Sequence, residues 1–174
     1  MNASAEAVED ATATEPPAED LAQSLVHAIF DGATLKDIHG IEDDVMEGVY
    51  AYAYKFYQEG KLDEAETFFR FLCLYDFYNA EYALGLGAVL QMRKRYQQAI
   101  DAYALSYALS RFDLRPLLQA GQCHLKLGTL DTARSCFQRV VDQSTDDRLV
   151  AKAQVYLEAI PVEGSDASPD GAHS

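Results

Sequence analysis

Apolar side chains recur every three or four residues over most of the chain between residues 46 and 160, which is the spacing of one face of an α-helix. In the first of these stretches Val49, Ala53 and Phe56 share such a face, and Gly60 follows where a turn is needed. The pattern therefore predicts a series of short helices joined by tight turns.

These helical stretches repeat at intervals of 34 residues. Three sets of equivalent positions keep their character, namely Ala53, Gly87 and Gly121; Ala65, Ala99 and Ala133; and Phe69, Tyr103 and Phe137. Gly60 and Gly128 keep the same interval, with Lys94 where a third glycine would be. Two small positions and one aromatic position in three consecutive windows are typical of the tetratricopeptide (TPR) helix-turn-helix unit. The small residues let the two helices approach closely, and the aromatic ring fills the gap to the next repeat.

A single TPR unit cannot bury its apolar face, so consecutive copies stack into a right-handed solenoid with a concave surface. We therefore predict an all-α fold with three repeats, at residues 46–79, 80–113 and 114–147. A last apolar stretch at residues 148–160 predicts a capping helix over the open end of the third repeat.

An N-terminal helix is predicted before the repeats, within residues 19–45, a segment that also connects it to the first repeat. Its apolar face comprises Leu21, Leu25, Val26, Ile29 and Phe30, and Gly32 would end it. This face either covers the first repeat or pairs with a second subunit, as in a homodimer. The acidic residues 1–18 and the final residues 161–174 are expected to be disordered tails, because neither contains enough apolar surface to offset the cost of ordering.

The formal net charge of −14 is unevenly distributed. Residues 1–20 contribute −6 and residues 161–174 contribute −3, which leaves −5 for the part between them. The basic cluster from Arg93 to Arg95 falls between two predicted helices and is interpreted as a solvated turn. An acidic chain without a basic stripe argues against direct binding of nucleic acid, because phosphates require clustered Lys and Arg.

No hydrophobic run approaches the length of a membrane span, and the N-terminus lacks the basic and apolar regions of a secretory signal. We therefore expect no membrane insertion. Cys73, Cys123 and Cys136 show no CxxC spacing and are interpreted as small buried hydrophobes in a reducing compartment. The chain is thus expected to stay in the cytoplasm.

The first helix of each TPR unit lines the concave face, so the groove residues can be counted along the repeats. They are Glu47, Tyr50, Tyr54 and Tyr57 in the first repeat, Glu81, Leu84, Ala88 and Gln91 in the second, and Arg115, Leu118, Gln122 and Leu125 in the third. The packing positions of the first repeat are filled separately, by Val49, Tyr52, Ala53 and Phe56. The three groove tyrosines are therefore extra aromatics, of a kind common at interfaces. The alternative is that the N-terminal helix folds over them and they are ordinary core residues.

This lining favours one class of ligand. A groove that holds a C-terminal carboxylate needs Lys, Asn or Arg as donors, whereas the first repeat offers Glu47 and tyrosines, so a negatively charged peptide end would be repelled. An extended peptide with apolar side chains or prolines can place them between the rings. Three buried aliphatic anchors are worth about 5–9 kcal/mol before the cost of ordering the peptide. Micromolar binding corresponds to about 8 kcal/mol, so we expect a modest, releasable affinity.

No residue pattern points to catalysis, and we expect no enzymatic activity, no metal site and no cofactor. The Gly-rich residues 85–87 lack the Lys-Ser or Lys-Thr of a phosphate loop. His124 occupies the repeat position of Phe56 and Leu90, which indicates a packed helix residue. Adjacent carboxylates precede helices, where favourable interaction with the helix N-terminus explains them.

Four segments resemble a known family: GATLKDIHGI, YAYAYKFYQEGKLDEAETFFRFLCLYDFYN, YALGLGAVLQMRKRYQQAIDAYALSYAL and AGQCHLKLGTLDTARSCFQRVV. They are similar to the class II chaperones of bacterial type III secretion, the SycD/LcrH/CesD group, and within it most closely to the SicA-type branch. The likeness covers about residues 30–160, and the stretch FFRFLCLYDFYN is much more specific than a general TPR match.

The resemblance implies a chaperone that holds the two hydrophobic translocator proteins of the secretion apparatus before export. The family's groove binds an extended segment near the N-terminus of the translocator, and the matching residues here are Tyr50, Tyr54, Tyr57, Leu84, Ala88 and Gln91. Members of the SicA-type branch also act as coactivators of an AraC-type transcription regulator. Family members are often homodimers through the N-terminal helix, here about residues 20–32.

Two alternatives stay open at this point. The same fold serves equally well as a TPR adaptor for another protein assembly, or the chain acts chiefly as a transcriptional coactivator. An operon that contains two secreted proteins with membrane helices favours the chaperone. A co-purifying regulator without such clients favours the coactivator.

Overall fold

The computed structural model describes residues 23, 24, 26–28, 30–110 and 112–161, and all regular secondary structure within these ranges is helical. The helices are α2 (Leu35–Ile38), α3 (Asp43–Gln58), α4 (Leu62–Tyr75), α5 (Ala80–Met92), α6 (Tyr96–Leu109), α7 (Arg115–Leu127), α8 (Leu130–Gln143) and α9 (Asp147–Ala159). The predicted all-α fold is confirmed.

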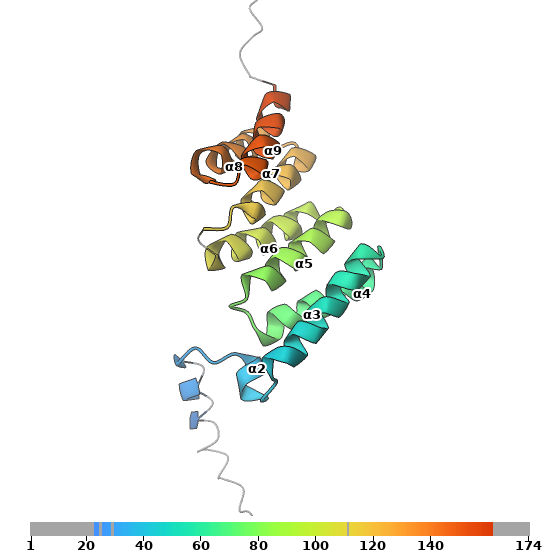
Figure 1. Ribbon diagram of the computed structural model, residues 1–174, viewed down its shortest axis with the longest axis vertical. Coiled ribbons are helices and arrows are strands. Elements are labelled where there is room, and N and C mark those ends of the chain that lie inside the picture. Colours follow the sequence, from blue (N-terminus) through green and yellow to red (C-terminus); the bar gives the residue numbers. More distant parts are fainter. Residues whose placement is uncertain (1–22, 25, 29, 111, 162–174) are drawn as a thin grey trace, which may run out of the picture.

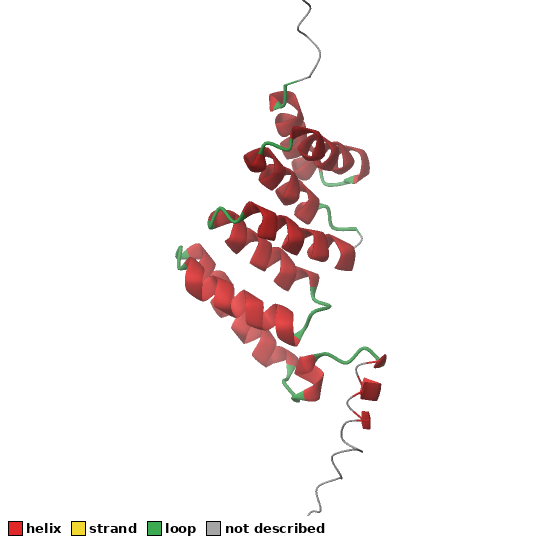
Figure 2. Cartoon of the chain, turned by 180° about the vertical axis from the view of Figure 1, so that it is seen from behind, coloured by secondary structure: helices red, strands yellow, loops and turns green. Residues whose placement is uncertain are grey.

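The helices form a two-layered stack. Each helix from α3 to α9 packs against the next one in sequence, and the odd-numbered helices also pack on one another, α3 on α5, α5 on α7 and α7 on α9. Figure 1 shows these helix pairs stacked along the long axis of the molecule, from α2 and α3 at one end to α8 and α9 at the other. Figure 2 shows the same stack from behind, with the connecting loops alternating between its two edges. This is the predicted TPR architecture, with α9 against the last helix pair.

Small residues at the repeat positions permit this close packing. A Cβ atom on Gly87 would lie 2.5 Å from the ring of Tyr103. One on Gly121 would lie 2.7 Å from the ring of Phe137. Phe69 of α4 reaches the next repeat, where a Cβ on Gly85 would lie 2.1 Å from its ring. The expected contact of small with aromatic positions is thus confirmed within the second and third repeats, and of these three rings it is Phe69 that meets a glycine of the next repeat.

Three turns between paired helices share a left-handed backbone conformation. Gly60 and Gly128 have φ values of 73° and 76°, which glycine adopts without steric cost. Lys94 occupies the equivalent place between α5 and α6 with a φ of 61°, a value that is uncommon for a residue with a Cβ atom. The repeat therefore extends from the helices to the turns that join them.

The predicted N-terminal helix is described only in part. Outside the described residues lie Leu21, Leu25, Ile29, all of residues 1–18 and residues 162–174. The described residues between 23 and 30 are helical, and Gly32 follows with a φ of 89°. Val26 and Phe30 are 51% and 85% exposed, so these two side chains do not cover the first repeat.

One expectation about the first repeat needs correction. Tyr52, assigned to a packing position, is 61% exposed, because α3 is the first helix of the repeat stack and its outer side has no earlier repeat to pack against. The helix α3 begins at Asp43, ahead of the repeat positions that start at residue 46, as expected where adjacent carboxylates stand at a helix N-terminus. Asp43 and Asp44 occupy its first turn, where negative charge is favourable.

A buried carboxylate joins the first two repeats. Glu66 of α4 is 8% exposed and accepts hydrogen bonds from Arg70 and Arg95, each at 2.8 Å. Arg93 also lies 3.2 Å from this carboxylate. Desolvation of Glu66 opposes its charged form, but the hydrogen bonds from Arg70 and Arg95 outweigh this effect, and the pKa of Glu66 is lowered. The turn at residues 93–95 is therefore not simply solvated, because two of its side chains hold the repeats together.

Candidate functional site

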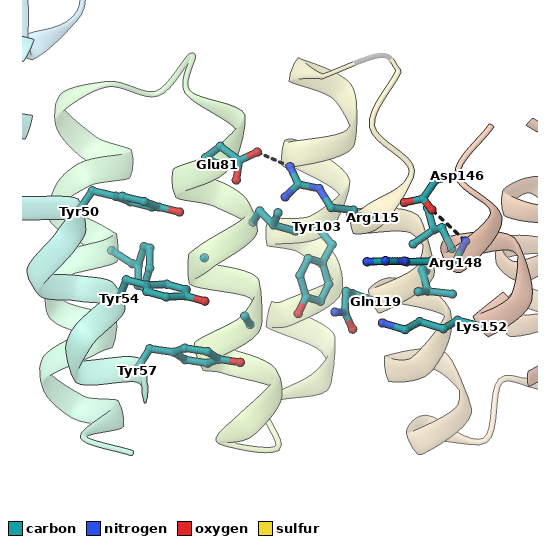
Figure 3. Close-up of a pocket in the computed structure, with 16 residues that line it drawn as sticks. Tyr50, Tyr54, Tyr57, Glu81, Tyr103, Arg115, Gln119, Asp146, Arg148 and Lys152 are labelled. Atoms are coloured by element: carbon teal, nitrogen blue, oxygen red, sulfur yellow. Dashed lines mark hydrogen bonds and ion pairs between the residues drawn. The ribbon is translucent and has the colours of Figure 1, made fainter. Parts of the chain in front are cut away.

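Three tyrosines of α3 form a ladder along one side of the concave face. Tyr50, Tyr54 and Tyr57 lie at helical spacing, with centroids of successive rings 6.4 Å and 6.1 Å apart. Figure 3 shows these rings one above another, all directed away from α3 into the same cavity. Tyr50 is held at 6.0 Å from the ring of Phe69 and 5.6 Å from that of Tyr82, whereas Tyr54 is 47% exposed. The middle of this tyrosine ladder is therefore open rather than ordinary core.

The tyrosine ladder faces a cavity of about 540 Å³ that is lined by α3, α5, α7 and α9, with Phe69 of α4 and Tyr103 of α6. A second hollow of about 490 Å³ adjoins it, since Tyr57, Ala88, Tyr103 and Gln119 line both. Together the two hollows form one continuous groove on the layer of odd-numbered helices.

Most of the predicted groove residues lie in this groove. The first cavity is lined by Tyr50, Tyr54, Tyr57, Glu81, Leu84, Ala88, Arg115 and Leu118. Gln91, Gln122 and Leu125 line the second hollow. Glu47 is exposed and lines neither of the two. The part that these residues play in binding stays a prediction.

A hydrogen-bonded chain crosses the floor of the groove. The hydroxyl of Tyr103 donates to Oε1 of Gln91 at 2.6 Å, and Nε2 of Gln91 donates to Oε1 of Gln122 at 3.1 Å. Burial raises the pKa of Tyr103, which is 1% exposed, so its hydroxyl stays protonated at neutral pH. Tyr103 comes from α6, and the sequence indicated only its packing role. The repeat position of Tyr103 indicates that its ring is buried. That position does not indicate that the hydroxyl reaches the groove.

The wall opposite the tyrosine ladder comes from α9, which was predicted only as a cap. Arg148 and Lys152 line the first cavity, and Tyr156, one turn further along α9, lines the second hollow. Figure 3 shows Arg148 and Lys152 extending toward Tyr103 and Gln119. Their spacing of four residues can be read from the sequence. Which face of a capping helix meets the groove depends instead on the curvature of the stack, which the sequence pattern does not specify.

Some charged side chains of the cavity form ion pairs and others do not. Arg115 of α7 binds Glu81, and its guanidinium lies 2.7 Å from Asp113. Hydrogen bonds to Asp113 and then to Glu81 raise the pKa of Arg115. Within the described ranges, no ion pair involves the side chain of Arg148 or Lys152. The groove therefore presents neutral tyrosines on one wall and unpaired cations on the other.

Two titratable side chains of α7, Cys123 and His124, are buried or half-buried. In the part of the chain that the structure describes, no group of three or more His, Cys, Asp and Glu side chains is placed to hold a metal ion. Nδ1 of His124 lies 2.9 Å from Oγ1 of Thr129, and burial lowers the pKa of this imidazole. Burial raises the pKa of the Cys123 thiol to about 11, so it stays protonated at neutral pH. None of the helices in the described ranges has both the length and the hydropathy of a membrane span.

Comparison with known sequences points to one family. A tetratricopeptide repeat model matches residues 46–79 and 81–111. The chain is 52% identical to the chaperone protein SicA of Salmonella typhimurium over 142 residues, which cover 82% of this chain and 86% of that protein. The predicted resemblance is thus confirmed for most of the chain.

Solved structures agree with this comparison. SycD of Yersinia enterocolitica, a type III secretion translocator chaperone, has a TM-score of 0.70 at 30% identity, and the match covers 74% of this chain and 99% of SycD. PcrH of Pseudomonas aeruginosa, crystallised with the chaperone binding region of PopD, has a TM-score of 0.66 at 38% identity, covering 70% of this chain and 94% of PcrH. SycD has also been crystallised with a peptide of the translocator YopD. By sequence and by fold, the chain therefore belongs to the family of class II type III secretion chaperones that bind translocator proteins.

Proposed function

We propose that this chain binds an extended, apolar segment near the N-terminus of each of two hydrophobic translocator proteins in the bacterial cytoplasm. The observation that carries the proposal is the tyrosine ladder, which faces an open cavity of about 540 Å³. The complexes of PcrH with a segment of PopD and of SycD with a peptide of YopD support it, because both chaperones share this fold.

The proposed mechanism follows from the properties of the client. A pore-forming protein exposes apolar membrane segments that aggregate or insert prematurely unless they are covered. A chaperone that occupies one anchor segment keeps each client soluble, separate from the other and competent for export. A binding free energy near 8 kcal/mol corresponds to micromolar dissociation, which lets the secretion apparatus remove the client. Nucleotide hydrolysis by this chain is not required.

A test of the groove uses pull-down after co-expression with the two candidate translocators encoded nearby. We expect wild type to retain both clients in the soluble fraction and Tyr50→Glu/Tyr54→Glu to lose them, because two carboxylates would enter the apolar wall. Tyr52→Glu is the matched control, since Tyr52 lies on the same helix, is 61% exposed and does not line the groove. Equal retention by all three proteins contradicts the proposal. Loss of helicity in the double variant, measured by circular dichroism, would instead assign these tyrosines to the core.

We propose a second role from the resemblance to the SicA-type branch, namely that the chain acts as coactivator of an AraC-type regulator after its clients have left. A promoter–reporter assay tests this role. We expect activation when the regulator and this chain are present without translocators, and loss of activation when either translocator is co-expressed in excess. A reporter that responds to the regulator alone contradicts the coactivator role and leaves the chaperone role untouched.

A further inference from the structure

The two walls of the groove differ in charge, although the molecule as a whole is acidic. The chain carries a formal net charge of −14, yet the first cavity is lined by three cations, Arg115, Arg148 and Lys152, and by two carboxylates, Glu81 and Asp146. Burial raises the pKa of Tyr50 on the opposite wall, so this hydroxyl brings no negative charge at neutral pH. An acidic protein therefore holds a locally basic surface inside its concave face.

Both carboxylates of the cavity already have partners. Glu81 binds the guanidinium of Arg115. The side chain of Asp146 accepts the backbone N–H of Arg148 at 2.9 Å and so caps the N-terminus of α9. No carboxylate of the described residues lies within ion-pair distance of the Arg148 guanidinium or the Lys152 ammonium. These two groups are the cations of the cavity that remain available to a ligand.

Arg148 and Lys152 lie across the groove from the tyrosine ladder. The two residues lie four apart on α9, so they share one face of that helix. Figure 3 shows both side chains extending from α9 into the space that the tyrosine ladder enters from α3. An extended segment that crosses from α3 to α9 therefore meets aromatic rings first and two unpaired cations afterwards.

We propose that the segment bound in this groove carries an acidic side chain beyond its apolar anchors, and that this carboxylate pairs with Arg148 and Lys152. The inference rests on the proposed function and adds a specificity element to it. Apolar contacts with the tyrosine ladder do not fix where along the groove the segment lies, because one aliphatic side chain can replace another between the rings. A carboxylate that must meet two fixed cations sets the register of the segment. The expectation that an anion is repelled applies to the first repeat only, because the opposite wall attracts one.

The test is a selection from random segments of about 16 residues, which span roughly 50 Å when extended. Both ends of each segment are joined to the display carrier, so that only side-chain carboxylates are available. The proteins compared are wild type, Arg148→Gln/Lys152→Gln, Lys55→Gln and Tyr50→Glu/Tyr54→Glu. Lys55→Gln is the matched control, because Lys55 is a cation of α3 that lines neither hollow.

We expect wild type to enrich apolar residues together with Asp or Glu at one fixed spacing from them. Arg148→Gln/Lys152→Gln retains the apolar enrichment and loses the acidic one, whereas Lys55→Gln behaves as wild type. A selected segment is then made as an amidated peptide and titrated against each protein. Replacing its Asp by Asn, or its Glu by Gln, raises the dissociation constant for wild type about five-fold, which is the effect of a solvent-accessible ion pair. The same replacement leaves binding to the Arg148→Gln/Lys152→Gln variant unchanged.

The failures of the two proposals can be told apart. Wild-type segments without acidic enrichment, or equal acidic enrichment by Arg148→Gln/Lys152→Gln, overturn the carboxylate pairing and leave the apolar groove intact. If wild type enriches no apolar segment, or if Tyr50→Glu/Tyr54→Glu enriches the same segments as wild type, the groove itself is not the binding site. The proposed function then fails together with the inference.

Discussion

Gly48 and Gly87 both lie inside helices, but their surroundings are opposite. A Cβ atom on Gly48 of α3 would meet nothing within 4 Å. On Gly87 of α5 it would lie 2.5 Å from the ring of Tyr103, a side chain that is 1% exposed and bonded through its hydroxyl to Gln91. Gly87 therefore sets the distance between α5 and α6, whereas Gly48 only adds flexibility to the unfolded chain.

These two glycines predict stability changes of opposite sign. Gly87→Ala should lower the free energy of unfolding by about 1–3 kcal/mol, because the buried ring of Tyr103 must move. Gly48→Ala should raise it by about 0.5–1 kcal/mol, the usual gain when alanine replaces glycine within a helix. Urea denaturation followed by circular dichroism gives both values. Destabilisation of equal size at the two positions would show that the contact with Tyr103 does not control helix spacing.

At the scale of helices, the connection between α4 and the turn before α6 depends on one carboxylate. Glu66 is 8% exposed and contacts three arginines, two of which belong to the next repeat. Its pKa is lowered in the folded protein. The stabilisation it provides is therefore fully present above the ordinary carboxylate pKa of 4.5 and is lost as the pH falls through the lower, folded value.

Glu66→Gln tests this connection. At pH 7 the variant should be about 2 kcal/mol less stable than wild type, because it loses charge-assisted hydrogen bonds. The difference should shrink below pH 4.5, where wild-type Glu66 also becomes protonated. Urea denaturation between pH 3 and pH 7 measures it, with Glu64→Gln as the control for an exposed carboxylate of the same helix. If the difference in unfolding free energy between the variant and wild type does not change with pH, the charge of Glu66 does not contribute to stability.

The sequence predicted the helices and their repeat well because these features are local. A small residue at Gly87 and an aromatic at Tyr103 indicate the same contact in every TPR unit, and the structure has that contact. Tyr52 was assigned wrongly because the first repeat has no preceding neighbour, so a position that is half-buried at Leu86 and buried at Ala120 is exposed there. Arg148 and Lys152 were missed because their place in the groove depends on how four helices curve together. Repeat position determines contacts between adjacent helices, and it does not determine which distant helices share a cavity.

At the scale of the whole molecule, the described N-terminal residues leave apolar surface uncovered. Val26 is 51% exposed and Phe30 is 85% exposed. The apolar face predicted for this helix has not found a partner within the described chain at these two positions. Pairing with a second copy would remove this surface from water, which is the alternative that the sequence left open.

We therefore predict a homodimer that depends on the N-terminal helix. Phe30→Glu should shift the protein from dimer to monomer at micromolar concentration, because it places a charge in the paired surface. Size-exclusion chromatography with light scattering measures the mass. Phe112→Glu is the control, since Phe112 is 98% exposed in the connection between α6 and α7 and is not part of that helix. An unchanged dimer in Phe30→Glu, or a monomer already in wild type, refutes this interface.

The groove has walls from the first and the last helix of the repeat stack, and α5 and α7 lie between them. The separation of the walls is thus a property of superhelical curvature rather than of any single contact. A ligand that touches both walls fits only one curvature, so its binding makes the solenoid stiffer against bending and stretching. Conversely, a pulling force along the long axis would separate α3 from α9 and so weaken the contacts of such a ligand with the two walls. We therefore expect extension of the stack to favour release of a segment that spans both walls.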